Sequence, residues 1–290
     1  MVGTNLWFKE LFMTYKIVSD SSSNIYQLSD LDFESAPLKI ITAKTEYVDT
    51  PDLNVEAMVN EIKEIKGKSG TTCPNISDWL RAFGEADIIF AVTITSRLSG
   101  SYASAAEAAK IYMEGRPGTK VFVVDSLSTG PEMGLIIEHL RSLMLKGESF
   151  EAIRDSVCEY QKKTHLLFSL QSLTNLARNG RVNPAVAKIA GVLGIRVMGA
   201  AKDGVLDPLH KIRGEAKTLD TLFCEMKKRG FSGGRVIIAH CFNAESAHIL
   251  KEKILAEFPS SKIKIEKNGA LCSFYAERGG VLVGFEGEEK

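Results

Sequence analysis

Short apolar runs alternate with helical patterns through the first half of this chain, and this alternation restricts the possible folds most strongly. The runs are nearly continuous in apolar residues, which is typical of parallel strands covered by helices on both faces. The expected strands are Tyr15 to Ser19, Leu38 to Thr42, Asp87 to Thr93 and Lys120 to Val124, and the expected helices are Val55 to Lys66, Ile76 to Phe83, Ser101 to Met113 and Glu132 to Lys146. We therefore predict a parallel sheet built from βαβ units.

After a helical stretch from Phe150 to Lys162, the second half shows a different succession of elements, with shorter strands and fewer helices between them. Its expected strands are Leu166 to Ser169, Ile195 to Ala200, Arg235 to Ala239, Ile263 to Glu266 and Val281 to Phe285, with helices at Glu215 to Lys228 and Ala244 to Phe258. We predict two α/β domains, residues 1–160 with the parallel sheet and residues 161–290 with a mixed sheet. Residues 1–12 are expected to be an extension, and the cleft between the domains is the expected ligand site.

Composition narrows the possible partners and surroundings. Lysine plus arginine and aspartate plus glutamate both number 36, so net charge gives no reason to expect nucleic acid as a partner. The five cysteines are scattered without the spacing of a zinc site, and we interpret them as buried thiols of a cytoplasmic protein. No apolar run is long enough to span a membrane, and the first residues do not form a signal peptide.

The usual motifs for cofactor binding and hydrolysis are missing from the sequence. It contains no glycine-rich cradle for dinucleotides or triphosphates, no Gly-x-Ser-x-Gly elbow and no His-Glu-x-x-His helix, so no cofactor or metal is expected. The histidines are isolated and are expected in ordinary structural or surface roles: His139, His165, His210, His240 and His248. We place His210 in a turn, where a role near a ligand is the less favoured alternative.

Two hydroxyl-rich stretches directly follow expected strands. They are Asp20 to Asn24 and Thr95 to Tyr102. Ligands of open α/β sheets collect beyond the carboxyl ends of strands, so both are candidate anion-binding loops. The second offers more hydroxyls than one helix cap requires, which favours binding. In the first, Asp20 could equally bond the backbone and support a local turn.

Several segments, taken in order, resemble the DegV family of bacterial proteins, which includes the fatty-acid-binding subunits of fatty acid kinase. The segments are Ile17 to Ser22, Pro37-Leu38 in the expected second strand, Thr71 to Pro74, Ser96 to Tyr102, Val124 to Ser126, Leu173 to Leu176, Asn179 to Val182, Lys211 to Gly214 and Gly279 to Phe285. The resemblance covers the chain from Met13 to Glu286.

This resemblance implies a lipid-binding carrier and not an enzyme. A long-chain fatty acid would place its carboxylate at the interdomain cleft and its tail in an apolar tunnel, and the catalytic subunit of fatty acid kinase would phosphorylate the carboxylate to an acyl phosphate. The residues expected to bind the ligand are Ser21, Thr71, Thr72, Ser96, Ser99, Gly100 and Tyr275. Arg181 and Arg213 are expected near the cleft mouth, where they would assist the partner or the transferring phosphoryl group.

Elementary energetics agree with such a division between head and tail. Hydroxyls and backbone N–H groups can hold a carboxylate with charge-assisted hydrogen bonds of about 1.5–3 kcal/mol each. Each buried methylene of a tail contributes about 0.8 kcal/mol, so the tail supplies most of the affinity and the head sets the orientation. Thr71 with Ser96 or Ser99 fits the head-binding task.

Other interpretations remain open for these residues. Thr71 to Ser77 can be a plain loop with a helix cap, and Arg181 and Arg213 can be solvated surface residues. Tyr275 stands where fatty-acid-binding members carry a histidine, and a neutral phenol cannot repeat the role of an imidazolium. Cys73 stands where the family often has glutamine, and we expect it to be a buried thiol.

Two further functions follow from these features. The chain could be an enzyme that acts on a small acyl or phosphorylated substrate at the same cleft, although no general base is evident. It could also carry another apolar ligand without a kinase partner.

Overall fold

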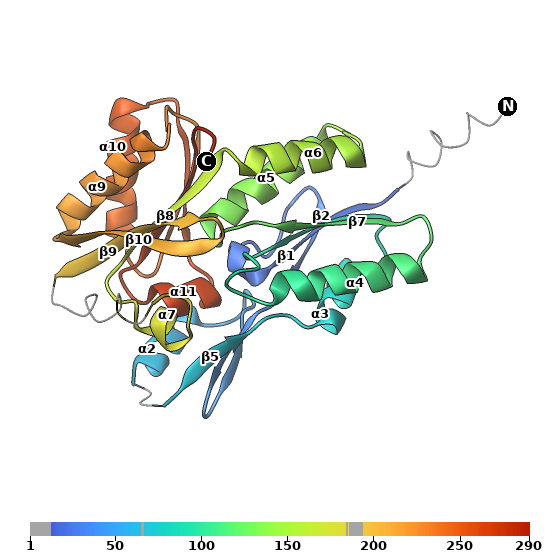
Figure 1. Ribbon diagram of the computed structural model, residues 1–290, viewed down its shortest axis with the longest axis horizontal. Coiled ribbons are helices and arrows are strands. Elements are labelled where there is room, and N and C mark those ends of the chain that lie inside the picture. The colour runs from blue at the N-terminus through green and yellow to red at the C-terminus, as the bar shows by residue number, and fades with distance from the viewer. Residues whose placement is uncertain (1–12, 65–66, 184, 186–193) are drawn as a thin grey trace.

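The computed structural model describes residues 13–64, 67–183, 185 and 194–290. The expected extension at residues 1–12 lies outside the described residues. Two main sheets lie side by side, and a smaller sheet projects from the first (Figure 1).

A parallel four-stranded sheet forms the first part of the fold, as predicted. Its strands follow the order β2-β1-β6-β7 and are β1 (Tyr15–Asp20), β2 (Asp32–Ala36), β6 (Ile88–Thr93) and β7 (Lys120–Asp125). Helices α3 (Ile76–Phe83) and α4 (Ser101–Gly115) cover one face, and α5 (Pro131–Leu145) and α6 (Phe150–Gln161) cover the other. Alternate residues of β6 serve the two cores, with Ile89 facing α3 and α4 and Phe90 facing α5 and α6.

The prediction that Leu38 to Thr42 belongs to the parallel sheet is wrong. Strand β3 (Lys39–Thr42) instead pairs antiparallel with β4 (Glu46–Val48) and β5 (Ser69–Thr72), and helix α2 (Val55–Glu64) follows β4 in the chain. Pro37 and Leu38 lie between strands. Strand β2 was not predicted because its sequence, Asp-Phe-Glu-Ser-Ala, lacks a continuous apolar run. It is an edge strand, and an edge strand keeps polar side chains on its exposed positions.

The second part is a six-stranded mixed sheet, which confirms the predicted class. Its order is β10-β9-β8-β13-β11-β12, with β8 (Thr164–Leu170), β9 (Ile195–Lys202), β10 (Val205–Arg213), β11 (Arg235–His240), β12 (Lys262–Lys267) and β13 (Val281–Glu286). Helices α9 (Glu215–Lys228) and α10 (Ala244–Glu257) share its outer core. His210 lies in β10, so its expected place in a turn is wrong; Pro208, where the strand is irregular, obscures the strand in the sequence.

Helix α5 joins the two sheets. It contacts β1 and β6 of the first sheet and β8, β11 and β13 of the second. Gly284 in β13 permits this close approach, because a Cβ there would lie 2.6 Å from the carbonyl carbon of Pro131. The predicted boundary after residue 160 falls within the last turn of α6, shortly before β8, and stays a prediction.

Short helices complete the region between the sheets. They are the 3₁₀ turn η1 (Ser21–Ser23), α7 (Thr174–Arg178) and α11 (Ala270–Ala276), and α11 packs against α2 and β3. Within the described parts of the chain, no helix has the length and apolar character needed to cross a membrane.

The cysteines only partly match expectation. All five are free, but Cys158 and Cys224 are exposed because they lie on the solvent faces of α6 and α9, and Cys73 is half-buried.

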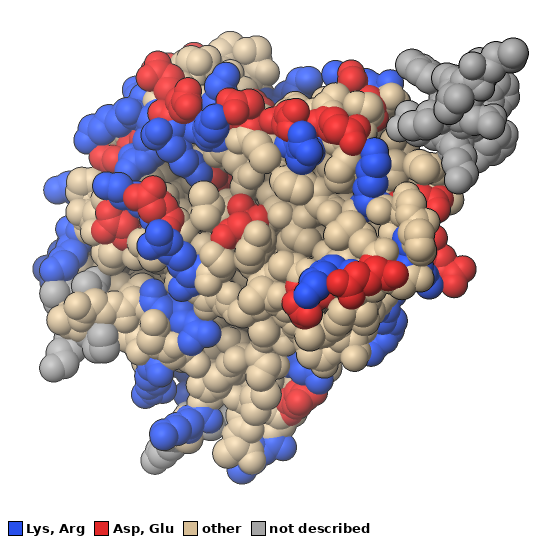
Figure 2. Space-filling view, turned by 45° about the vertical axis from the view of Figure 1, so that its right-hand side comes forward, with Lys and Arg blue, Asp and Glu red and all other residues tan. Residues whose placement is uncertain are grey.

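Acidic and basic side chains are interspersed over the face seen in Figure 2 and surround a broad area that carries neither.

Candidate ligand-binding site

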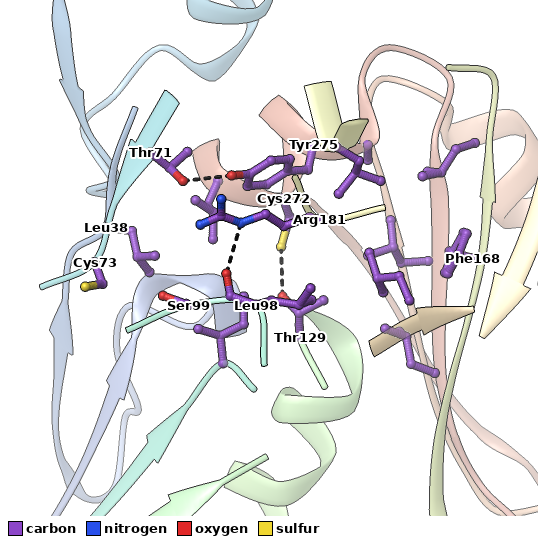
Figure 3. A pocket seen from close by; sticks show the side chains of 18 of the residues that line it. Leu38, Thr71, Cys73, Leu98, Ser99, Thr129, Phe168, Arg181, Cys272 and Tyr275 are labelled. Carbon is purple, nitrogen blue, oxygen red and sulfur yellow. Dashed lines mark hydrogen bonds between the residues drawn. The ribbon is translucent and has the colours of Figure 1, made fainter. Parts of the chain in front are cut away.

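A cavity of about 290 Å³ lies where the two main sheets and the small sheet meet. Both halves of the chain line it, from Leu38, Thr71, Thr72, Cys73, Ile94, Leu98, Ser99, Gly100 and Thr129 to Leu166, Phe168, Leu170, Leu176, Arg181, Leu206, Leu271, Cys272, Tyr275, Ala276 and Leu282. Figure 3 shows polar side chains at one end and Phe168 at the opposite end. The cavity is therefore amphipathic along its length.

The polar end is built around a hydrogen bond between two hydroxyls. Thr71 Oγ1 at the end of β5 lies 2.8 Å from Tyr275 Oη in α11. Ser99 and Arg181 line the same end (Figure 3). Thr72 and Gly100 also line it and are solvent-exposed, so the cavity reaches the surface near its hydroxyls.

Helix α11 owes its position to a buried carboxylate elsewhere in the chain. Asp49 accepts hydrogen bonds from the N–H groups of Ala270 (2.8 Å) and Leu271 (3.0 Å), which occupy the first turn of α11. It also accepts one from the Tyr26 hydroxyl at 2.7 Å. A carboxylate at a helix N-terminus satisfies free N–H groups and the helix dipole, so Asp49 fixes the helix that presents Tyr275.

Arg181 brings a positive charge to the polar end from the segment after α7. Its Nε donates to the carbonyl oxygen of Leu98 at 3.0 Å, and Nη1 donates to the carbonyl oxygen of Asn179. The first contact ties the second half of the chain to the loop after β6. Arg181 therefore lines the polar end from the second half of the chain and supplies a cation beside its hydroxyls.

The chemistry of Tyr275 suits a hydrogen-bond donor. Burial raises the pKa of its phenol, while the Thr71 hydroxyl and the Arg181 charge act in the opposite direction. Because the net shift is upward from about 10, the hydroxyl keeps its proton at physiological pH. A protonated phenol can donate to an anionic oxygen.

The remaining wall is apolar because of strand alternation in β8. Leu166, Phe168 and Leu170 line the cavity, whereas Leu167, between them, packs into the core beneath α9 and α10. Leu206 from β10 and Leu282 from β13 extend this surface. Such a wall holds hydrocarbon without offering it a polar partner.

A buried carboxylate also organises the two hydroxyl-rich loops. Asp20 accepts from Ile94 N (2.8 Å), from Ser101 Oγ (2.6 Å) and from both N and Oγ of Ser22. It thereby joins the ends of β1 and β6 to the start of α4, and the predicted bond from Asp20 to its own loop is confirmed. Helix α4 starts after Gly100, which has no side chain to cap it, and Ser99 Oγ accepts from the N–H of Ser101, the first residue of the helix, at 3.3 Å.

Some of the predicted residues lie in the cavity wall and others do not. Thr71, Thr72, Ser99, Gly100, Arg181 and Tyr275 line the cavity. Ser21 is buried outside it, where its Oγ accepts from Leu38 N at 3.0 Å. Ser96 is exposed, with its N–H bonded to Asp125, and Arg213 is exposed at the end of β10.

Sequence reasoning missed much of the apolar wall and two polar residues. Cys272 donates to the Ser22 carbonyl oxygen at 3.4 Å, and Thr129 lies near its sulfur. The apolar run of β8 was visible in the sequence, but nothing in it indicated which face meets a cavity. Cys73, expected to be buried, lines the opening, where Gly100 leaves room for its sulfur.

Comparison with known proteins identifies the family of this chain. The family model described as uncharacterised protein, DegV family, matches residues 14–287. The chain belongs to the DegV family. A DegV domain-containing protein of Streptococcus gordonii is 40% identical over 279 residues, which span 94% of this chain and 99% of that relative.

Two solved structures superpose closely on this fold. A protein from Eubacterium eligens loaded with heptadecanoic acid is 40% identical with a TM-score of 0.93, covering 95% of this chain and 100% of that chain. The Streptococcus pneumoniae Fatty Acid Kinase (Fak) B3 protein loaded with linoleic acid is 41% identical, with the same TM-score of 0.93 and the same coverage of 95% and 100%.

Proposed function

We propose that this DegV protein binds one long-chain fatty acid and presents its carboxylate to the catalytic subunit of a fatty acid kinase. The carboxylate lies among Thr71, Ser99, Tyr275 and Arg181, and the tail extends along the apolar wall toward Phe168. The kinase subunit supplies ATP and forms an acyl phosphate. This reaction places the protein in the cytoplasm, where ATP is available.

The observation that carries the proposal is the division of one cavity into a polar and an apolar end. The polar end offers hydroxyl donors and a cation, which together bind a carboxylate by charge-assisted hydrogen bonds of about 1.5–3 kcal/mol each. The apolar end removes a hydrocarbon tail from water at about 0.8 kcal/mol per methylene. A long-chain fatty acid combines both features.

The solved relatives support the same ligand class, because two proteins at 40% and 41% identity hold heptadecanoic and linoleic acid. Those ligands are a saturated and an unsaturated acid, so the class is a long-chain fatty acid and not one particular compound. The name of the pneumococcal relative supports the kinase partner.

One feature favours a second candidate, a carrier without a kinase partner. By the family resemblance, Tyr275 stands where fatty-acid-binding members carry a histidine, and a neutral phenol donates a hydrogen bond but does not exchange protons near neutral pH. An enzyme that acts on a small substrate is less favoured. The titratable side chains in the described cavity wall are Arg181, Tyr275 and the thiols Cys73 and Cys272, and this set contains no carboxylate or imidazole to act as a general base.

A reconstituted kinase assay tests the presentation of the ligand. Purified protein loaded with oleate is mixed with a bacterial fatty acid kinase catalytic subunit and ATP, and acyl phosphate is trapped with hydroxylamine. We expect acyl hydroxamate only when both proteins are present. Binding of oleate without any hydroxamate, from the wild type and from Tyr275→His, would support the carrier without a kinase.

A further inference from the structure

The end of the cavity opposite the hydroxyls is closed by one aromatic ring. Phe168 is 2% exposed and is the only aromatic side chain among the described residues of the apolar wall. Figure 3 shows it farthest from the Thr71–Tyr275 hydrogen bond among the labelled residues. A tail that starts at the polar end and follows the wall therefore reaches this ring last.

The position of the ring depends on a glycine in the neighbouring strand. Gly199 of β9 is directly opposite Phe168 in the antiparallel register. A Cβ at position 199 would lie only 2.3 Å from Cζ and 2.8 Å from Cε2 of the ring. The ring thus lies across the Cα of Gly199, in space that any other residue would fill.

The same Cβ would also be crowded by β10, the strand on the other side of β9. The carbonyl oxygen of Asp207 in β10 would lie 2.5 Å from a Cβ there, beside the irregular pairing between Pro208 and His210. Nothing about the backbone angle of Gly199 demands glycine, since its φ is not positive. Position 199 is glycine because the Phe168 ring and strand β10 occupy the space that a side chain would need.

We propose that the Phe168–Gly199 pair sets the depth of the cavity and thereby the length of the hydrocarbon tail that it accepts. This inference rests on the proposed binding of a fatty acid. With glycine at 199 the ring lies against the sheet and forms the end wall of the cavity. Because protein interiors are packed at the level of single methyl groups, the terminal methyl of the tail meets the ring face.

The pair is best tested at Phe168, because a side chain at position 199 would also meet Asp207. Phe168→Leu removes the ring and lengthens the space, and Phe168→Trp shortens it. Leu167→Ala is the matched control: it lies in the same strand and is fully buried, but it faces the core beneath α9 and α10. The Leu167→Ala variant therefore shows how a loss of core packing affects binding when the cavity itself is unchanged.

Delipidated wild type and variants are offered equimolar myristic, palmitic, stearic and arachidic acids, and bound acids are quantified by native mass spectrometry. We expect Phe168→Leu to raise the affinity for longer acids relative to shorter ones by about fourfold for each methylene that newly finds room. Phe168→Trp should shift the preference to shorter acids, and Leu167→Ala should keep the wild-type profile.

Equal scaling of all four affinities in both Phe168 variants would overturn this inference while leaving fatty-acid binding intact. A delipidated wild type that takes up none of the four acids would overturn the proposed function itself. The two failures are therefore distinguishable.

Discussion

Thr71 and Tyr275 are separated by 204 positions in the chain, yet their hydroxyl oxygens lie 2.8 Å apart. One of the two hydroxyls donates to the other, so the pair satisfies itself across the polar end of the cavity. A carboxylate that enters between them can accept from both. This exchange of one neutral hydrogen bond for two charge-assisted ones favours an anionic head group.

We predict that Tyr275→Phe weakens oleate binding by about tenfold or more, because one charge-assisted hydrogen bond of about 1.5–3 kcal/mol is lost. The phenyl ring keeps the packing against Phe274, so stability should change little. Isothermal titration with oleate measures the effect, and methyl oleate, which carries no charge, serves as the comparison ligand. An equal loss of affinity for both ligands would contradict a specific role of the hydroxyl.

Thr71→Val preserves the shape of the threonine side chain and removes its hydroxyl. Since the proposed binding mode places one head group against both Thr71 and Tyr275, we expect the combined Thr71→Val and Tyr275→Phe variant to deviate from additivity by more than about 0.5 kcal/mol. A double-mutant cycle on oleate affinity measures this coupling. Strict additivity would show that the two hydroxyls do not share a ligand.

We predict that Arg181→Ala reduces oleate affinity about tenfold and that the loss shrinks as salt concentration rises, because a partly exposed charge is screened. Arg213→Ala is the matched control, since this arginine is exposed and does not line the cavity. It should leave binding unchanged. An equal effect of the two substitutions on affinity would argue against a head group beside Arg181.

Ligand should protect Cys73 from alkylation. Cys73 lines the opening of the cavity, whereas Cys158 and Cys224 are exposed elsewhere. We expect saturating oleate to slow the reaction of Cys73 with N-ethylmaleimide several-fold and to leave the other two rates unchanged, as followed by peptide mass spectrometry. Uniform rates with and without oleate would place the ligand away from this opening.

Stability should fall between pH 6.5 and pH 4 because of His139. Burial, with the nearby Arg235 charge, lowers the pKa of this imidazole to about 4, and its ring stacks on Tyr160 at 4.1 Å. The unfolded chain takes up a proton near pH 6.5, so this contribution is complete above that pH and is lost as the pH falls toward 4.

The size of this effect is about 1–3 kcal/mol after allowance for partial exposure. Urea unfolding of wild type and His139→Phe at several pH values measures it. The variant should lose less stability than the wild type over this interval. Parallel curves would mean that other groups cause the pH dependence.

Much of the fold could be predicted because apolar periodicity reports burial. The strands β1, β6 and β7 have nearly unbroken apolar runs, and the structure confirms them in the parallel sheet. The edge strand β2 and the bulged β10 escaped prediction because exposed positions and Pro208 break the pattern. Helix α11 was missed because Asp49, a carboxylate remote in sequence, holds its first turn.

The candidate site could be predicted only in part, and the reason is also physical. Thr71, Ser99 and Tyr275 were selected from local motifs and a family resemblance, and all three line the cavity. Ser21 was selected on the same grounds, but its hydroxyl oxygen accepts a hydrogen bond from the backbone N–H of Leu38. Whether a hydroxyl faces a ligand or a neighbouring strand depends on tertiary packing, which no local pattern encodes.

Native mass spectrometry of the purified protein, followed by denaturing extraction and identification of the lipid by mass, tests the central claim most directly. We predict one equivalent of a long-chain fatty acid per chain, displaced by added oleate and retained poorly by Tyr275→Phe. Protein that is purified empty and takes up neither palmitate nor oleate would contradict the account.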